Sequence, residues 1–424
     1  MSLLEARDER RGPLAFRSDN MNASAKAIAI LAVIAAAVAG LVFCASGTVS
    51  AAVNPDSPLS GDDLYNEAFK FLKNIGIWFM LMMVAFLMMF IKKFEWGVCL
   101  AVLLSAASSY LVYAGILQFY FGAEWNQDLM IRAVVCAITY VIAIGGFIGI
   151  VKQWHYFLGG IAFAFVYALV EWICCNTAWF GTMATDPGGT MMVHMCAAYF
   201  GVGAAIAIRD QKAFDEPMYT TTHSIAFVWL SAMLLWLLWP TFVCGLLPME
   251  QFSWGTMTCY MSGLGSIIST YIVCMVCQGK VNPLVYTYAM LAGPVAIGCT
   301  LLYVGPWAAL VIGFAAGAVS ALCFLYMQNP FCKLIGARDI MGIHNLHGMG
   351  GWVGVAAIVI IFLFEGHVDN AVANICQAFA VVAIALVGGA VTGLIIRLCK
   401  GKPMEQFSDD YDFIRSEDPE LGGR

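Results

Sequence analysis

The sequence predicts an all-α polytopic membrane protein with eleven core transmembrane helices, arranged as inverted 5+5 repeats plus one, and an additional N-terminal helix or signal segment. The first observation is composition: 61% of the 424 residues are hydrophobic, 11% are charged and the mean hydropathy is +0.82, which is unlike soluble domains. The second is that apolar windows of roughly 20 residues, enough to cross a bilayer, recur along the chain. The third is a polar motif that occurs twice inside such windows.

The N-terminal part divides into a hydrophilic segment, 1–26, and an apolar segment, 27–52. The apolar segment ends in small residues between Cys44 and Ala52, which resemble a signal-peptidase site. The charged leader is long for a signal peptide, so we favour a retained transmembrane helix. We expect 1–26 to be cytoplasmic, 53–398 to form the main membrane domain and 399–424 to be a cytoplasmic acidic tail.

The core spans follow a polar segment, 54–74, which we expect to be an external loop. With the N-terminus inside, only Lys70, Lys73 and Arg132 of the 21 lysines and arginines fall outside, as the positive-inside rule requires. The C-terminus is then cytoplasmic in a multi-pass protein of the plasma membrane. The eleven spans are expected at 75–92, 96–116, 130–151, 155–175, 190–209, 223–247, 259–278, 282–303, 305–327, 342–364 and 372–398.

The repeated polar motif consists of an Asp, a Gly three residues later and a His eight residues later. It runs from Asp186 to His194 and again from Asp339 to His347. The predicted topology makes the two helices antiparallel, as inverted repeats around a shared site require. Polar groups at membrane depth are usually functional, although histidines that only hydrogen-bond neighbouring helices are the plainer alternative.

A second histidine, His344, lies three residues before His347 and on the same helical face. At about 1.5 Å per residue, His194 lies about 12 Å from Asp186 and His347 about 12 Å from Asp339, but His344 lies only about 7.5 Å away. Depth alone therefore favours His347 as the partner of His194.

Other chemistries find no support in the sequence. The fifteen cysteines show no paired metal-binding spacing, and there is no phosphate-binding loop or basic patch for nucleic acid. We therefore expect no cofactor, no metal and no nucleic-acid partner.

Four stretches resemble one family. The segment from Asp339 to Gly348, Asp-x-x-Gly-Ile-His-Asn-Leu-His-Gly, resembles the signature of the Rh glycoprotein branch of the ammonium transporter/Rh channel (Amt/Rh) family, and the segment from Asp186 to His194 resembles its other histidine helix. The block from His223 to Phe242 is similar to its sixth core helix, and the stretch from Phe86 to Lys92 to its first. The resemblance covers the chain from about residue 70 to the tail.

The resemblance implies a homotrimer in which each subunit conducts ammonia through its own narrow apolar pore, after ammonium is deprotonated at the vestibule. It implies no enzymatic activity, and carbon dioxide and methylamine are further candidate solutes. Leu246 stands where the high-affinity branch has a cation-binding Ser, which favours low-affinity conduction. By resemblance, the pore histidines are His194 and His344, with His347 as second candidate; the vestibule or structural carboxylates are Asp186 and Glu171; the gate is Phe242; and the supporting residues are Asp339 and Asn345.

Two roles remain possible for Asp186, and two other classes of function compete with an ammonia channel. Asp186 could shape the vestibule or simply cap a helix. Facing histidines could also hold haem or another metal in a membrane redox protein. An ammonium sensor that does not conduct is the third possibility.

Overall fold

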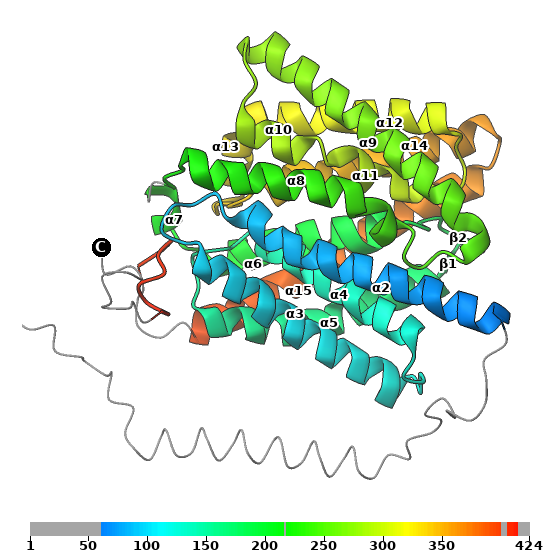
Figure 1. The fold of residues 1–424 in the computed structure, drawn as a ribbon, viewed down its shortest axis with the longest axis horizontal. Coiled ribbons are helices and arrows are strands. Elements are labelled where there is room, and N and C mark those ends of the chain that lie inside the picture. The colour runs from blue at the N-terminus through cyan, green and yellow to red at the C-terminus, as the bar shows by residue number, and fades with distance from the viewer. Residues whose placement is uncertain (1–60, 216–217, 400–404, 414–424) are drawn as a thin grey trace, which may run out of the picture. The chain divides into compact units, whose positions relative to one another are not determined.

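The structure, a computed structural model, is a bundle of membrane-length helices described over residues 61–215, 218–399 and 405–413. In these residues ten helices are long and apolar enough to span a membrane, and 283–299 adds a shorter apolar one (Figure 1). This confirms the predicted class and the eleven segments of the core. The predicted N-terminal helix or signal segment, 27–52, lies outside the described residues, as does 1–26.

The first half of the core holds five spans, and the second half holds five more and the final helix. The first five are α2 (Gly61–Met88), α3 (Trp96–Gly115) with η2 (Ile116–Tyr120), α4 (Gln127–Ile144), α5 (Gln153–Asn176), and η3 (Thr190–Met195) with α6 (Cys196–Ile208). The rest are α8 (Thr222–Val243), α9 (Met249–Gln278), α10 (Pro283–Ala289) with α11 (Ala292–Ala296) and η4 (Ile297–Cys299), α12 (Pro306–Leu322) with η5 (Cys323–Met327) and α13 (Gln328–Ile335), η6 (His344–Gly348) with α14 (Met349–Phe364), and α15 (Val368–Cys399). Small elements are β1 (Ala178–Trp179), which pairs antiparallel with β2 (Thr182–Met183), and α7 (Lys212–Asp215).

The two halves pack alike. α3 lies against α5 in the first half, and α9 lies against α12 in the second. In both pairs a glycine of one helix faces a serine of the other: a Cβ on Gly160 would lie 2.0 Å from Ser108 Oγ, and one on Gly313 would lie 1.8 Å from the Ser262 carbonyl oxygen. Such close backbone approach is how small residues join membrane helices, and its recurrence at equivalent places fits the predicted inverted repeats.

Two spans, α2 and α9, begin at least ten residues earlier than predicted. α2 starts at Gly61, so most of the segment expected as an external loop is helical. Two of its polar side chains donate to groups inside the protein: Lys73 Nζ donates to the Leu247 carbonyl (3.0 Å), and Asn74 Nδ2 donates to Gln127 Oε1 (2.9 Å). α9 starts at Met249 rather than 259. Hydropathy misplaced both starts because it treats a polar side chain as exposed, whatever its partners.

The eighth predicted span, 282–303, is broken into α10, α11 and η4. Pro294 lies in α11 and has no amide hydrogen for the helical ladder. Thr190 Oγ1, from the η3 turn, donates to the Val295 carbonyl oxygen at 2.8 Å. The amide that Pro294 lacks leaves the Met290 carbonyl free, and the Ser266 hydroxyl donates to it. The Val295 carbonyl is free for Thr190 because the N–H of Cys299, its helical donor, donates to Thr190 Oγ1 at 3.1 Å instead.

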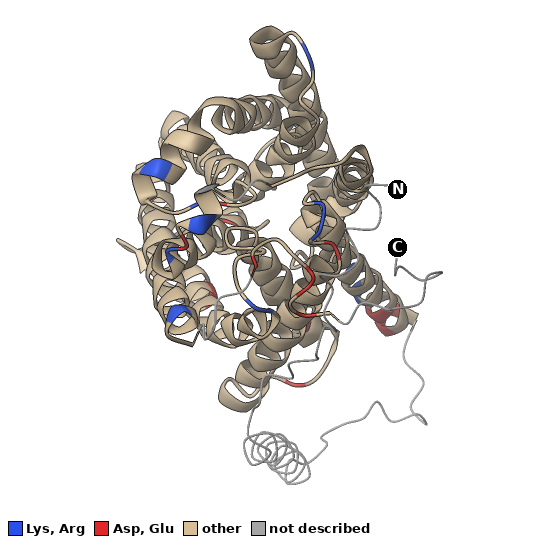
Figure 2. Cartoon of the chain, turned by 90° about the vertical axis from the view of Figure 1, so that its left-hand side faces the viewer, with Lys and Arg blue, Asp and Glu red and all other residues tan. Residues whose placement is uncertain are grey.

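The tail docks on one end of the bundle, which we call the tail face. Asp409 accepts hydrogen bonds from the backbone N–H groups of Glu95, Trp96 and Gly97 at 3.1, 3.1 and 2.8 Å, and its own N–H donates to the Lys93 carbonyl at 2.8 Å. Lysines and arginines gather on the loops and helix ends of this face (Figure 2). We call the other end, where α2 begins and α8 ends, the distal face.

Candidate functional site

Each histidine segment begins with an aspartate that caps it: Asp186, which is partly buried, and Asp339, which is fully buried. Asp186 Oδ2 accepts from the N–H groups of Met191 (2.8 Å) and Met192 (2.9 Å). The Asp339 carboxylate accepts from the N–H groups of Ile343 (3.0 Å) and His344 (2.9 Å). The structure therefore shows the capping contact that was one of two readings of Asp186.

Burial changes the acidity of both caps. Desolvation raises the pKa of the Asp186 and Asp339 carboxyls to about 6, although the backbone N–H groups that donate to them pull each pKa down. Cys299 Sγ also lies 3.4 Å from Asp186 Oδ1 and donates to it, a further contact that lowers the pKa of Asp186.

Both segments then open with a π-helical turn, η3 in one and η6 in the other. A π-helical turn holds one extra residue and is common at functional sites. The apolar periodicity of the sequence gave no sign of either turn, because one inserted residue does not change the mean hydropathy of a window.

The histidine pair is formed by His194 and His347. Their Nδ1 atoms lie 3.2 Å apart, and the rings are nearly parallel at an interplanar angle of 17°. His194 has no exposed surface and His347 is 6% exposed. A single hydrogen can bridge two Nδ1 atoms only if one imidazole carries it and the other accepts, so the two rings must be different tautomers.

The contact that the family resemblance predicted for His344 is therefore made by His347. His344 instead stacks on Phe331, with ring centroids 4.0 Å apart, and its ring lies 5.8 Å from that of Tyr199. The reason is the equal offset from the caps: His194 and His347 each lie eight residues beyond a capping aspartate, so they reach the same depth. The depth argument from the sequence favoured this residue.

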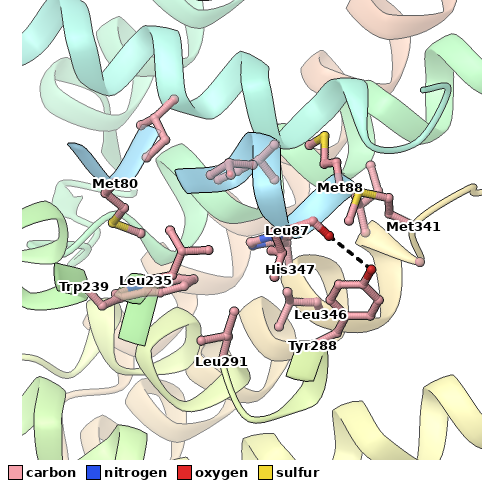
Figure 3. A pocket seen from close by; sticks show the side chains of 15 residues that line it. Met80, Leu87, Met88, Leu235, Trp239, Tyr288, Leu291, Met341, Leu346 and His347 are labelled. Carbon is pink, nitrogen blue, oxygen red and sulfur yellow. Dashed lines mark hydrogen bonds between the residues drawn. The ribbon is translucent and has the colours of Figure 1, made fainter. Parts of the chain in front are cut away.

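A narrow apolar cavity of about 30 Å³ reaches His347 (Figure 3). This volume holds roughly two water-sized molecules. Tyr288 lies at its edge, with its hydroxyl donating to the Leu87 carbonyl at 3.2 Å. The lining residues are Met80, Val84, Leu87, Met88, Ile138, Ile142, Leu235, Trp239, Tyr288, Leu291, Met341, Gly342, Ile343, Leu346 and His347.

Two aromatic rings enclose His194 from α8. The Trp239 and Phe242 rings lie 5.8 and 5.7 Å from the His194 ring, and Phe242 meets it edge to face at 80°. Phe242 is 5% exposed. The predicted gate residue thus contacts the histidine pair, and Trp239, to which the sequence analysis gave no role, contacts it as well.

A larger cavity of about 290 Å³ adjoins the narrow one toward the tail face. Tyr288 and Met341 line both cavities. The two cavities are therefore neighbours, with Tyr288 and Met341 in the walls of both.

Glu171, a predicted vestibule or structural carboxylate, forms an ion pair between helices. Its oxygens accept from Arg132 Nη2 at 2.7 Å and Nε at 3.2 Å, and also from the Tyr113 hydroxyl. These contacts join α5 to α4 and α3. The neighbouring guanidinium compensates the negative charge of Glu171, so the geometry favours a structural ion pair.

Asn345 connects the second histidine segment, η6, to α13. Its Nδ2 donates to Gln328 Oε1, and Gln328 Nε2 donates to the Asp339 carbonyl at 2.7 Å. Sequence reasoning assigned Asn345 a supporting place but missed Gln328. An uncharged amide inside an apolar span was the available signal.

Comparisons with known proteins identify the family of this chain. The profile of the Ammonium Transporter Family matches residues 58–410. The chain is 29% identical to Ammonium transporter Rh type A of Bos taurus, covering 74% of this chain and 75% of that one, and 29% identical to Ammonium transporter Rh type C of Xenopus laevis, covering 79% and 78%.

Among solved structures, the chain is similar to Nitrosomonas europaea Rh50, with a TM-score of 0.79 and 28% identity over 84% of this chain and 95% of that one. It also shares its fold with a Sensor Amt Protein, at a TM-score of 0.67 and 18% identity over 79% and 92%. The protein belongs to the ammonium transporter family, in its Rh glycoprotein branch.

Proposed function

We propose that the protein conducts ammonia as the neutral molecule, after ammonium has lost a proton at the mouth of the pore. One observation carries this proposal: an apolar cavity of about 30 Å³ ends at His347, which contacts the buried His194. The cavity is large enough for ammonia and too small for a hydrated ion.

The cost of desolvation favours the neutral species. Moving an ammonium ion into an apolar cavity costs several kcal/mol or more, because its charge loses water without a counter-charge. Ammonia loses only hydrogen bonds. An imidazole nitrogen of the pair replaces one of them inside the cavity.

The histidine pair suits a small polar solute. One ring uses Nδ1–H as donor and keeps an unprotonated Nε2, whereas the other uses Nδ1 as acceptor and keeps Nε2–H. Together the two outer nitrogens offer one acceptor and one donor without adding a fixed charge. A proton on both Nδ1 atoms would break the contact.

A haem site fits these histidines less well. Axial imidazole nitrogens on opposite sides of one metal ion would lie about 4 Å apart, twice a metal–nitrogen bond of about 2.0 Å. The Nδ1 atoms of His194 and His347 lie 3.2 Å apart. The spacing favours a shared hydrogen over an iron atom between the rings.

We also propose roles for the residues around the pair. Phe242 acts as a gate at the distal side of His194, which its edge-to-face contact supports. Asp186 and Asp339 act as caps that fix where each histidine segment begins, and Asn345 holds the second one in place.

We further propose a homotrimer in the plasma membrane, with the tail face in the cytoplasm. The family membership and the basic residues on that face support both points. A trimeric mass in native mass spectrometry of gently extracted protein is expected, and a monomer or dimer would contradict it.

The function is tested by flux into liposomes. An imposed ammonium gradient should alkalinise the lumen of proteoliposomes faster than that of empty liposomes, as read by a trapped pH dye, with no matching signal from a voltage probe. A voltage change in step with the flux would show that the ion itself crosses. Methylamine and carbon dioxide can be tested in the same way.

A further inference from the structure

A buried lysine lies on the pore-lining side of α2. The residues of α2 that line the narrow cavity are Met80, Val84, Leu87 and Met88. Lys73 lies seven residues before Met80, two helical turns nearer the distal face, and therefore on the same stripe. The separation along the helix is about 10 Å.

The side chain of Lys73 is fixed in place. It is 4% exposed and lies well inside α2, which begins at Gly61. Its Nζ donates to the Leu247 carbonyl at 3.0 Å and lies 4.7 Å from the centre of the Phe69 ring. A carbonyl oxygen and an aromatic face are both partners that suit an ammonium group.

The contacts of Lys73 lead directly to the proposed gate. Leu247 belongs to the turn that follows α8, only five residues after Phe242. One helical turn below Lys73, Ile77 packs against Gly245 of the same turn, where a Cβ would lie 3.0 Å from Ile77 Cδ1. Lys73, the turn and Phe242 therefore stand together at the distal end of the pore lining.

Lys73 is not a member of any of the ion pairs found among the described residues. Lys70, one turn away, has its own partner in Asp128, with Nζ and Oδ2 2.6 Å apart. The negative charge of Asp128 also attracts Lys73, although the two form no ion pair. Glu250, in the first turn of α9, is exposed to solvent.

We propose that Lys73 is a fixed cation at the distal mouth of the pore, where it repels ammonium ions and favours their deprotonation. The inference rests on the proposed function and adds a specificity-determining residue to it. A positive charge about 10 Å away lowers the local population of a monovalent cation by about twofold in a water-like medium and about fifteenfold at an effective dielectric constant of 20. The neutral molecule is unaffected by the charge.

The test uses four variants in proteoliposomes of known orientation, fixed by protection of a tail epitope. Lys73→Gln removes the charge and keeps a donor for Leu247, Lys73→Met removes both, and Lys73→Arg keeps both. Lys70→Gln is the matched control, because the lysine it replaces is already paired. Initial flux is measured against total ammonium added on the distal side and, separately, on the tail side.

We expect Lys73→Gln and Lys73→Met to lower the half-saturating ammonium concentration by about twofold to fifteenfold from the distal side and to leave it unchanged from the tail side. The effect should shrink in about 1 M salt, where the Debye length is about 3 Å. Lys73→Arg and Lys70→Gln should match the wild type.

Two outcomes would overturn the proposal. If Lys73→Gln matches the wild type and only Lys73→Met changes the flux, the residue positions the turn through its hydrogen bond and its charge has no role. Equal changes from both sides would likewise exclude a charge at one mouth. If the wild type itself gives no flux above that of empty liposomes, the proposed function is wrong. This result is distinct from the two above, because both of them require a wild type that conducts.

Discussion

Replacing either histidine of the pair is expected to remove most of the ammonia flux. In the variant His347→Leu the cavity loses its only imidazole lining residue, and Nδ1 of the buried His194 loses its partner. An unpaired buried polar group costs about 1–3 kcal/mol. If ammonia loses a comparable hydrogen bond in the transition state for passage, the flux falls by about 5-fold to 150-fold.

The two histidines should behave as one unit. His194→Leu removes the other half of the same contact, so the double variant should conduct no more than about fivefold less than either single variant. Residues that share one hydrogen bond are strongly non-additive in double-mutant cycles. His344→Leu is the internal control, because His344 packs on Phe331 away from the pair and its backbone N–H still reaches Asp339.

The assay is ammonia-driven alkalinisation of proteoliposomes, corrected for the amount of folded protein by size-exclusion chromatography. His344→Leu should stay within about threefold of the wild type. If His344→Leu abolishes the flux and His347→Leu leaves it intact, the pair seen in the structure is not the conducting one. Normal conduction by all three single variants would refute a histidine pore.

Three further predictions concern stability, each measured as thermal unfolding of detergent-solubilised protein. Asp186→Ala should lower stability by roughly 2–3 kcal/mol because two helix-start amides lose their acceptor, whereas a fully stable but inactive variant would indicate direct action on the cation. Gly313→Ala should cost at least about 1–3 kcal/mol, because its Cβ would lie 1.8 Å from a carbonyl oxygen, while Gly115→Ala, whose nearest neighbour is 3.8 Å away, should be neutral. Burial raises the pKa of Asp186 and Asp339 to about 6, above the value of about 3.9 for an aspartate in the unfolded chain. The folded state therefore binds more protons, and its stability should fall as the pH rises from about 4 to about 6. Asp339→Asn should flatten this dependence, and an unchanged slope would show that Asp339 does not titrate in this range.

The sequence allowed the helices to be predicted because each span must bury its backbone hydrogen bonds in lipid, which requires long apolar runs. It misplaced the start of α2, because Lys73 and Asn74 hydrogen-bond to distant parts of the chain, the turn after α8 and the first residue of α4. Such partners are 174 and 53 residues away in the chain. No local property of the sequence reports them.

The candidate site was predictable in its parts and not in its pairing. The repeated offset of eight residues from Asp186 and Asp339 identified both histidine segments. The choice between His344 and His347 depended on the phase of the π-helical turn, which is set by how the cap and its neighbours pack. A general resemblance to a family does not fix that phase, whereas the internal repeat of this chain does.

The cap of α3 has a consequence for biosynthesis. Glu95, the residue before this helix, makes no side-chain capping bond. Its own amide and the first two amides of the helix donate instead to Asp409, up to 314 residues later in the chain. At about 5–20 residues per second, a ribosome makes Asp409 roughly 15–60 s after Glu95. The second helix of the core thus waits, with its first turn incomplete, until almost the whole polypeptide has been translated. A chain truncated before Asp409 would lack the acceptor of these amides, so the start of α3 would stay uncapped.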